Sequence, residues 1–464
     1  MNIRPTEYQR RRSWVARVGN LEIGGGHPVR VQSMTTTSTN DTEACVRQAI
    51  RIIKAGGELV RLTTQGSREA ENLGRISQQL RREGYQTPLV ADVHFNANVA
   101  DVAARYAEKV RINPGNYVDP ARTFRKLEYT DEEYLQELQK IEDRVVPFIN
   151  ICKAYHTAIR IGVNHGSLSD RIRNRYGDTP EGIVESCMEF LRIFRRHDFR
   201  DVVISIKSSN TVVMVKSVRL LVRVMADEGM FYPLHLGVTE AGEGEDGRIK
   251  SAVGIGALLC EGIGDTIRVS LSEEPECEIP VARRLVESVE ECVCLREEAE
   301  ASIADDTVRL HIDEPCWEDY QLKASMAVGA LFIDRKATRL ELSGAHDEKR
   351  LRELADAILQ AARIKFTKTE YISCPGCGRT LYDLQSTIAR IKKATAHLVG
   401  LKIGIMGCIV NGPGEMADAD YGYVGAGPGR VSLYRGQECI EKNIPEAEAV
   451  ERLLSLIEHD RKKG

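Results

Sequence analysis

Short apolar runs rich in β-branched residues recur through about the first 270 residues, and a pattern with helical period separates them. Runs of this length and composition predict strands. In one of the intervening patterns, Val46, Ala49, Ile50 and Ile53 share a helix face, and Gly56-Gly57 ends the helix. Strand and helix alternating in this way favour a (β/α)8 barrel over an open doubly wound sheet, although strand number alone does not show closure. The predicted strands are 29–34, 59–64, 88–94, 109–113, 158–164, 202–210, 233–240 and 266–272.

Two segments depart from this alternation. Near 117–157 the charged helical pattern "FRKLEYTDEEYLQELQKIEDR" is far longer than a usual connection, and we expect an inserted helical lobe there. From 290 to 367, strand patterns at "TVRLHI" and "GALFID" precede an amphipathic helix, which predicts a small α+β segment. The barrel would then occupy 1–289, the interposed segment 290–367, and a cysteine-containing α/β domain 368–464.

Polar and charged side chains gather at or just beyond the C-terminal halves of the predicted barrel strands. In a barrel these positions converge on one mouth, where such folds place their active sites. For any single arginine there, a structural role is as plausible as a binding role: it could form an ion pair with a local acid that only holds a loop. Five cations from five strands, with only two strand-end acids to pair with them, instead favour an anionic ligand such as a diphosphate. The set is Arg61, Asp92, His94, Arg111, Asn113, Arg160, Asn164, Lys207, Ser209, Glu240, Arg268 and Ser270.

Glu240 is the acid that we single out. It follows a strand and precedes a glycine-rich turn in "HLGVTEAGEGEDG", so it can project into the mouth. We interpret Glu243, Glu245 and Asp246 as a solvated loop. The segment "GEGEDG" matches no nucleotide-binding fingerprint, and "GAGPGR" at 425–430 is more typical of a hairpin turn than of a phosphate loop.

Composition and charge add few constraints. The chain has 464 residues, 42% of them apolar, and a formal net charge of −4, which gives no reason to expect a nucleic-acid or membrane partner. No apolar run is long enough to span a membrane, and the polar, basic start is not typical of a secretory signal. Twelve cysteines in such a chain indicate reduced thiols, so we expect a cytoplasmic protein.

Three cysteines have a spacing that suggests a metal centre. Cys374 and Cys377 form a CxxC motif in "SCPGCGRT", and Cys408 follows in "GCIVNGPGEMADADYG". Three thiolates are one ligand short of a tetrahedral site or a cubane cluster. His397 lies inside a predicted helix, so Glu415, in the glycine- and proline-rich loop, is the candidate for the fourth ligand. A carboxylate on a mostly thiolate iron site forms a labile bond, which suits substrate ligation. We interpret the other cysteines as plain thiols.

The residues alone leave two other interpretations open. One is a zinc-stabilised barrel that acts as a phosphosugar isomerase or a pterin-type transferase, with a purely structural cysteine module. The other is an iron–sulfur carrier or sensor without enzymatic activity. The ring of cations and Glu240 argue against the carrier, and a carboxylate in place of a fourth thiol argues against structural zinc.

Several longer motifs together resemble the 4-hydroxy-3-methylbut-2-enyl-diphosphate synthase family, iron–sulfur enzymes of the methylerythritol phosphate route to isoprenoids. The resemblance covers about 29–280 and 371 to near the C-terminus. It implies a TIM barrel and a C-terminal domain like half of a sulfite or nitrite reductase, with a [4Fe–4S] cluster held by Cys374, Cys377, Cys408 and Glu415. The motifs are "RINPGN", "IRIGVNHGSL", "LHLGVTEAGEGEDGRIKSAVGIGALL", "EGIGDTIRVSLS", "CPGCGRT" and "GCIVNGPGEMADADYG".

The resemblance also implies a reaction: reductive ring opening of 2-C-methyl-D-erythritol 2,4-cyclodiphosphate to (E)-4-hydroxy-3-methylbut-2-enyl diphosphate, with ferredoxin or flavodoxin as electron donor. Glu240 would supply or stabilise the proton on the leaving oxygen, and the other strand-end residues would bind the substrate. We expect a homodimer. The motifs "EYTDEEY" and "GEGEDG" match plant-like members, whose interposed domain is much longer. The sequence leaves open whether barrel and cluster meet within one chain or across a dimer, with a slight preference for the latter.

Overall fold

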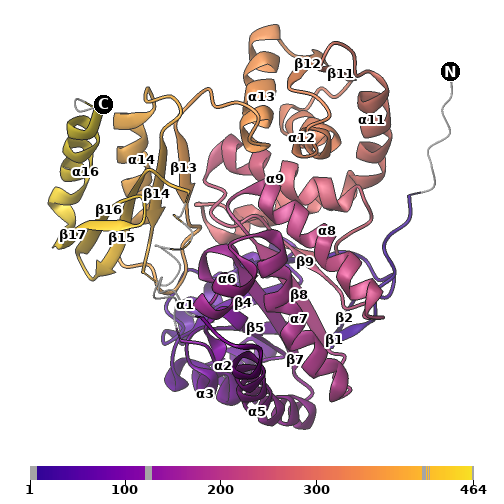
Figure 1. The fold of residues 1–464 in the computed structure, drawn as a ribbon, viewed down its shortest axis with the longest axis vertical. Helices are drawn as coiled ribbons and strands as arrows, with labels where there is room; N and C mark the ends of the chain where they lie inside the picture. Colours follow the sequence, from indigo (N-terminus) through magenta and orange to yellow (C-terminus); the bar gives the residue numbers. More distant parts are fainter. Residues whose placement is uncertain (1–7, 121–127, 410–413, 415, 417, 462–464) are drawn as a thin grey trace.

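The N-terminal half of the chain is a closed barrel of parallel strands (Figure 1). The computed structural model describes residues 8–120, 128–409, 414, 416 and 418–461. The strand order is β8-β7-β6-β5-β4-β3-β10-β9, and a parallel bridge between Ile204 and Leu234 closes the ring. The predicted barrel is therefore confirmed. Its strands are β3 (Arg30–Met34), β4 (Leu59–Thr64), β5 (Leu89–Val93), β6 (Lys109–Ile112), β7 (Ala158–Asn164), β8 (Val202–Lys207), β9 (His235–Leu236) and β10 (Thr266–Ile267).

The last two strands are much shorter than their apolar patterns suggest. Both β9 and β10 contain 2 residues, because the chain leaves the ladder and continues as loops at the mouth. A hairpin that the sequence analysis did not predict, β1 (Ala16–Val18) with β2 (Leu21–Ile23), covers the opposite end of the barrel. Its apolar side chains pack with residues at the N-terminal ends of the strands, among them Leu59 and Val90.

Amphipathic helices surround the strands. Helix α1 is typical: the Asp41 side chain accepts a hydrogen bond from the Ala44 backbone N–H at its start, and Gly56, with φ of 103°, follows its end. The helices are α1 (Thr42–Lys54), α2 (Ser67–Arg82), α3 (Ala97–Ala103), α4 (Pro114–Tyr117), α5 (Asp131–Tyr155), α6 (Asp170–Tyr176), α7 (Pro180–Arg196), α8 (Thr211–Asp227), α9 (Gly244–Leu259) and α10 (Glu278–Glu287).

The segment for which the sequence predicts an inserted helical lobe contains α5, a helix of 25 residues. A capping box between Thr130 and Glu133 starts it. It lies in the crossover between β6 and β7 and packs against α7, where the Tyr134 hydroxyl donates a hydrogen bond to Glu189.

The interposed segment packs on the barrel and shares its apolar core. It consists of α11 (Val289–Ala301), β11 (Thr307–Ile312), α12 (Trp317–Ile333), β12 (Arg339–Gly344) and α13 (Glu348–Ala361), and β11 pairs with β12 in parallel. The prediction of a strand at "GALFID" is wrong, because these residues lie at the end of α12. A helix buried on nearly every side shows the same continuous apolar run as a buried strand. Glycines at Gly256 and Gly329 leave room for α12 against α9.

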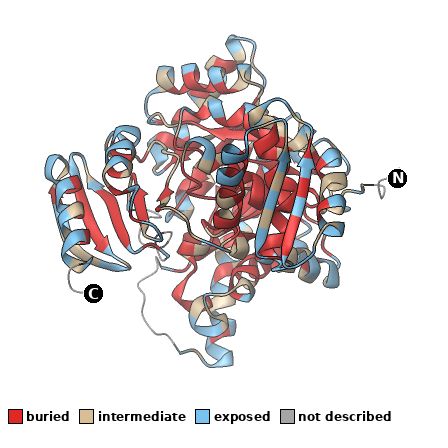
Figure 2. Cartoon of the chain, turned by 90° about the horizontal axis from the view of Figure 1, so that it is seen from above, coloured by how far each residue is buried: buried red, intermediate tan, exposed pale blue. Residues whose placement is uncertain are grey.

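The C-terminal domain is a mixed sheet with its own apolar core (Figures 1 and 2). Its strand order is β13-β14-β15-β16-β17, with parallel pairing up to β15 and antiparallel pairing beyond it. Its main apolar core is separate from that of the barrel, and the ion pairs Lys250–Glu370 and Lys368–Asp246 join the two domains. Its elements are β13 (Glu370–Ser373), α14 (Leu384–Thr395), β14 (Lys402–Met406), β15 (Tyr421–Gly427), β16 (Arg430–Arg435), β17 (Glu438–Pro445) and α16 (Glu446–Arg461).

Among the described helices, none combines the length and the apolar character needed to cross a bilayer.

Candidate active site

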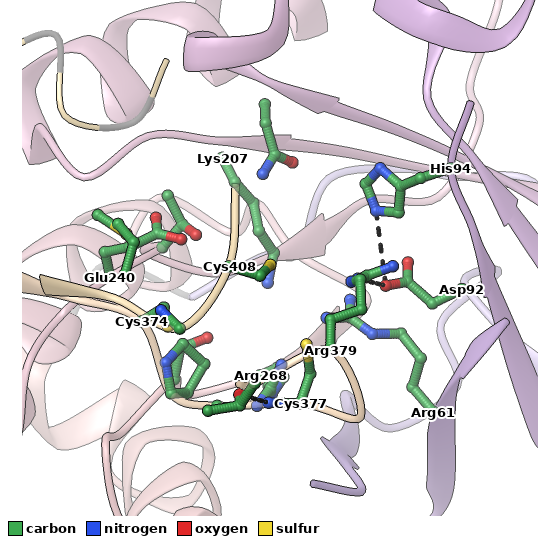
Figure 3. Close-up of a pocket in the computed structure, with 18 of the residues that line it drawn as sticks. Arg61, Asp92, His94, Lys207, Glu240, Arg268, Cys374, Cys377, Arg379 and Cys408 are labelled. Carbon is green, nitrogen blue, oxygen red and sulfur yellow. Dashed lines mark hydrogen bonds and ion pairs between the residues drawn. The ribbon is translucent and has the colours of Figure 1, made fainter. Parts of the chain in front are cut away.

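A pocket of about 740 Å³, part of it open to solvent, lies between the barrel mouth and the cysteine loops of the same chain (Figure 3). The slight preference for a cross-chain arrangement is therefore wrong for this structure. Ten of the strand-end residues that we singled out line the pocket: Arg61, Asp92, His94, Arg111, Arg160, Asn164, Lys207, Glu240, Arg268 and Ser270. Cys374, Cys377 and Cys408 line it from the other domain, together with Arg379 and Thr380, and Thr239 lines it from the barrel.

Two candidates do not line this pocket. The Asn113 side chain caps α4 by accepting a hydrogen bond from the Gly115 N–H at 3.1 Å, and its amide donates to the Ser167 hydroxyl at 2.8 Å. It therefore shapes the loop after β6. Ser209 is buried in the loop after β8, outside the pocket lining.

Arg268 has a carboxylate partner that the sequence analysis missed. Its Nε and Nη2 atoms both donate to Glu278 at 2.8 Å, and both side chains are almost fully buried. Burial alone would lower the pKa of Arg268, but Glu278 outweighs that effect and raises it. Glu278 lies at the start of α10, beyond the last barrel strand, so no strand-end pattern pointed to it.

Three other cations of the pocket, Arg61, Arg160 and Lys207, lie close to one another. The Nε atom of Arg61 lies 3.0 Å from the Met34 sulfur, and that of Arg160 lies 3.0 Å from the Ser205 hydroxyl. Burial, with Arg160 and Arg61 nearby, holds the pKa of Lys207 well below its usual value. Among the described residues, Arg61, Arg160 and Lys207 form no ion pair within the salt-bridge distance of 4.0 Å, so an anionic ligand would relieve their mutual repulsion.

Asp92 supplies the negative charge beside Arg111 and Arg379 in the pocket. Its carboxylate lies 3.3 Å from Arg111 Nη1 and 3.0 Å from Arg379 Nη2. The pKa of Asp92 lies well below its usual value: burial would raise it, but Arg61, His94 and Arg111 outweigh burial. Burial and Arg111 lower the pKa of His94 to about 3, so this imidazole is neutral at physiological pH.

Glu240 lies across the pocket from Asp92 in the view of Figure 3. It is 3% exposed and has φ of 48°, an uncommon backbone conformation for a residue with a side chain. The segment after it is not merely a solvated loop, so that prediction is wrong. Glu243 pairs with Lys392 of the C-terminal domain at 3.0 Å, and Glu245 accepts a hydrogen bond from the Trp317 indole at 2.9 Å. These contacts fix the loop that carries the acid.

The cysteine loops begin where two neighbouring parallel strands end. Cys374 follows β13 and Cys408 lies just beyond β14, so their thiols approach the same edge of the sheet. The Gly407 N–H donates to the Cys374 sulfur at 3.2 Å. Burial raises the pKa of Cys374 to about 12, and Cys377 and Cys408 contribute.

Three thiols in one pocket, with a backbone N–H directed at a sulfur, form a soft donor set that suits an iron–sulfur cluster. Among the described residues, no three His, Cys, Asp or Glu side chains lie close enough to hold a single metal ion. Glu415, our candidate for the fourth ligand, lies outside the described residues.

Comparison with known proteins identifies the family. Residues 14–283 match the GcpE TIM-barrel domain and residues 370–459 match the GcpE protein C-terminal domain. The chain is 52% identical to 4-hydroxy-3-methylbut-2-en-1-yl diphosphate synthase (flavodoxin) from Bacteroides thetaiotaomicron, over 98% of this chain and 99% of the relative. The enzyme of the same name from Bacteroides fragilis is 52% identical, over 97% of this chain and 96% of the relative. The one from Porphyromonas gingivalis is 44% identical, over 98% of this chain and 98% of the relative.

The alignment with the Bacteroides thetaiotaomicron enzyme spans 605 positions, whereas this chain has 464 residues, so that relative contains residues that this chain lacks. Neither family model includes the interposed segment. Both family domains are nevertheless present in one chain, in the expected order, and they meet at one pocket. The chain therefore belongs to the 4-hydroxy-3-methylbut-2-en-1-yl diphosphate synthase family.

Proposed function

We propose that this protein opens the ring of 2-C-methyl-D-erythritol 2,4-cyclodiphosphate by two-electron reduction and releases (E)-4-hydroxy-3-methylbut-2-enyl diphosphate. The observation that carries the proposal is the single pocket in which a cation-rich barrel mouth faces three cysteines. A cyclic diphosphate supplies the negative charge that Arg61, Arg160 and Lys207 require. The three thiols supply the site for a redox cofactor.

Family membership implies an iron–sulfur cluster, and we propose that it is a [4Fe–4S] cluster held by Cys374, Cys377, Cys408 and Glu415. When bound, the cluster supplies the electrons for the reduction. The names of the relatives specify flavodoxin, and we propose flavodoxin as the donor here as well. A homodimer, a cytoplasmic location and the domain limits at 289 and 367 stay predictions.

The protein's own residues bind, orient and protonate the substrate. We propose that Arg61, Arg160 and Lys207 hold the phosphate oxygens, and that Arg111, Arg268, His94, Asn164 and Ser270 complete the site. Glu240 places its carboxyl group where the C3 oxygen departs and delivers the proton that this oxygen needs to leave as water. The C-terminal domain covers the mouth and limits access of water to the reacting carbon atoms.

Protein isolated without oxygen is expected to be brown, to contain about four irons per chain, and to convert the cyclodiphosphate when reduced flavodoxin is supplied. Metal analysis, the absorption spectrum and product chromatography measure these three properties. Stoichiometric zinc without iron after reconstitution would contradict the cluster assignment and favour a zinc-stabilised barrel.

Lys207→Ala and Arg268→Ala are expected to differ, although both remove a cation from the pocket. Lys207→Ala should weaken binding of the cyclodiphosphate by about 10- to 150-fold, because a hydrogen bond to a charged group contributes roughly 1.5–3 kcal/mol. Arg268→Ala should also lower the free energy of unfolding by roughly 3–5 kcal/mol, because it leaves Glu278, 1% exposed, without its partner. Calorimetric titration and denaturant unfolding measure the two effects.

Arg75→Ala, on the exposed surface of α2, is the matched control and should change neither quantity. Unaltered affinity in Lys207→Ala would remove Lys207 from the substrate site.

A further inference from the structure

We propose that Arg379 and Asp92 form a docking pair that seats the cysteine loop on the barrel mouth, so that Asp92 positions the C-terminal domain instead of binding substrate. The sequence predicts Asp92 as a substrate ligand and does not point to Arg379. The proposal builds on the proposed function, because the seated loop is the one that carries Cys374 and Cys377.

The pair joins two domains across a buried interface. Asp92 lies in β5 at the C-terminal half of the strand, and Arg379 follows Cys377 by two residues. The Arg379 Nη2 atom donates to Asp92 Oδ2 at 3.0 Å, and the two side chains are 7% and 2% exposed. A charge this far from water needs its partner. If the domains separated, each of the two groups would have to be hydrated again or would remain unpaired.

The surroundings of Asp92 explain why it is suited to docking and not to phosphate binding. One oxygen faces Arg379, and the other faces Arg111 at 3.3 Å. Both carboxylate oxygens are therefore occupied by cations. A carboxylate would also repel a diphosphate placed against it. Asp92 thus holds Arg111 from one side and the cysteine loop from the other.

Two further contacts seat the same loop. At its start, the Ser272 hydroxyl donates to the Cys374 carbonyl oxygen at 2.9 Å. Near its end, Gly378 is pressed against the barrel: a Cβ atom built there would lie 2.7 Å from the Thr37 carbonyl oxygen. The docking pair follows directly after this close contact. Of these contacts, it is the one made by two charged side chains.

Variants that break the Arg379–Asp92 pair should bind iron normally but turn the substrate over less efficiently. Arg379→Gln and Asp92→Asn should each retain the iron content and spectrum of the parent but lower kcat/KM by about 10- to 100-fold, because the cysteine loop is seated less often. Asp92→Asn also weakens the contact with Arg111, so it should be the poorer single variant. The double variant should be no worse than Asp92→Asn alone, because the Arg379–Asp92 interaction is already lost there. Arg390→Gln, on the exposed surface of α14, is the control from the same domain.

Domain docking can be followed without turnover. Lys365 lies in the connector between α13 and β13, and its side chain is 56% exposed. Trypsin should cut there faster in both single variants than in the parent, and small-angle scattering should show a larger radius of gyration. This readout does not depend on the identity of the substrate, so it separates failure of the docking proposal from failure of the proposed reaction.

Two outcomes would overturn the docking pair. One is full additivity of the two losses, which would show independent roles. The other is an Asp92→Asn variant with unchanged trypsin sensitivity and weakened cyclodiphosphate binding, which would restore Asp92 as a substrate ligand. If Arg379→Gln fails to retain iron, the test rests on Asp92→Asn, which leaves the cysteine loop unaltered. Its trypsin sensitivity and kcat/KM then show whether the pair seats the loop.

Discussion

A Glu240→Gln variant is expected to turn the cyclodiphosphate over about 10²- to 10⁴-fold more slowly than the parent, the range typical for loss of a general acid. Glutamine keeps the shape of the side chain but has no acidic proton to give to the departing oxygen. Substrate affinity should change little, because in the proposed binding mode the phosphates contact the cations that line the pocket from other strands. Single-turnover kinetics with pre-reduced protein measures the ring-opening step separately from electron delivery.

Glu245→Gln is the control for this experiment. Glu245 lies in the first turn of α9, five residues after Glu240, and the change removes one negative charge there. Its side chain accepts a hydrogen bond from Trp317 and does not line the pocket. Its turnover should match that of the parent. If Glu240→Gln keeps full turnover, the proton comes from another group and the acid is misassigned.

Replacing Cys408 by alanine is expected to abolish stable iron binding and, with it, all ring opening. A cluster left with two thiolates in this pocket loses one of its strong bonds, and no other described cysteine lines the pocket to replace it. Cys439→Ala is the matched control, since this thiol is in the same domain but outside the pocket. Iron content and the visible spectrum after anaerobic reconstitution measure the difference.

Variants of Glu415 test the fourth ligand. Glu415→Ala should leave a cluster on three thiolates that loses iron readily and gives a [3Fe–4S] signal in air. Glu415→Cys should form a stable cluster with little turnover, because a thiolate exchanges less readily than a carboxylate. Electron paramagnetic resonance and iron analysis distinguish these states. Unchanged spectra, stability and turnover in Glu415→Ala would turn attention to Asp418 or Asp420 in the same loop.

Local pattern was sufficient for most of the barrel and much of the site. Residues at strand ends converge whenever a barrel forms, so the positions of Arg61 and Glu240 in the strand pattern are enough to predict that both lie at one mouth. The hairpin at "GAGPGR" is likewise confirmed as the turn between β15 and β16. The pattern failed at "GALFID", since a fully buried helix and a buried strand have the same run of apolar residues.

The sequence by itself therefore determined the family, the barrel and the three cysteines, because each depends on short-range periodicity or on a contiguous motif. The tertiary structure alone decided which charges are neutralised and which face the pocket. Arg268 is paired with Glu278, and Arg379 pairs with Asp92, which is 287 positions away in the chain. It also decided that barrel and cysteines meet within one chain. Such pairings depend on how separately folded layers dock, and no local pattern of residues encodes that.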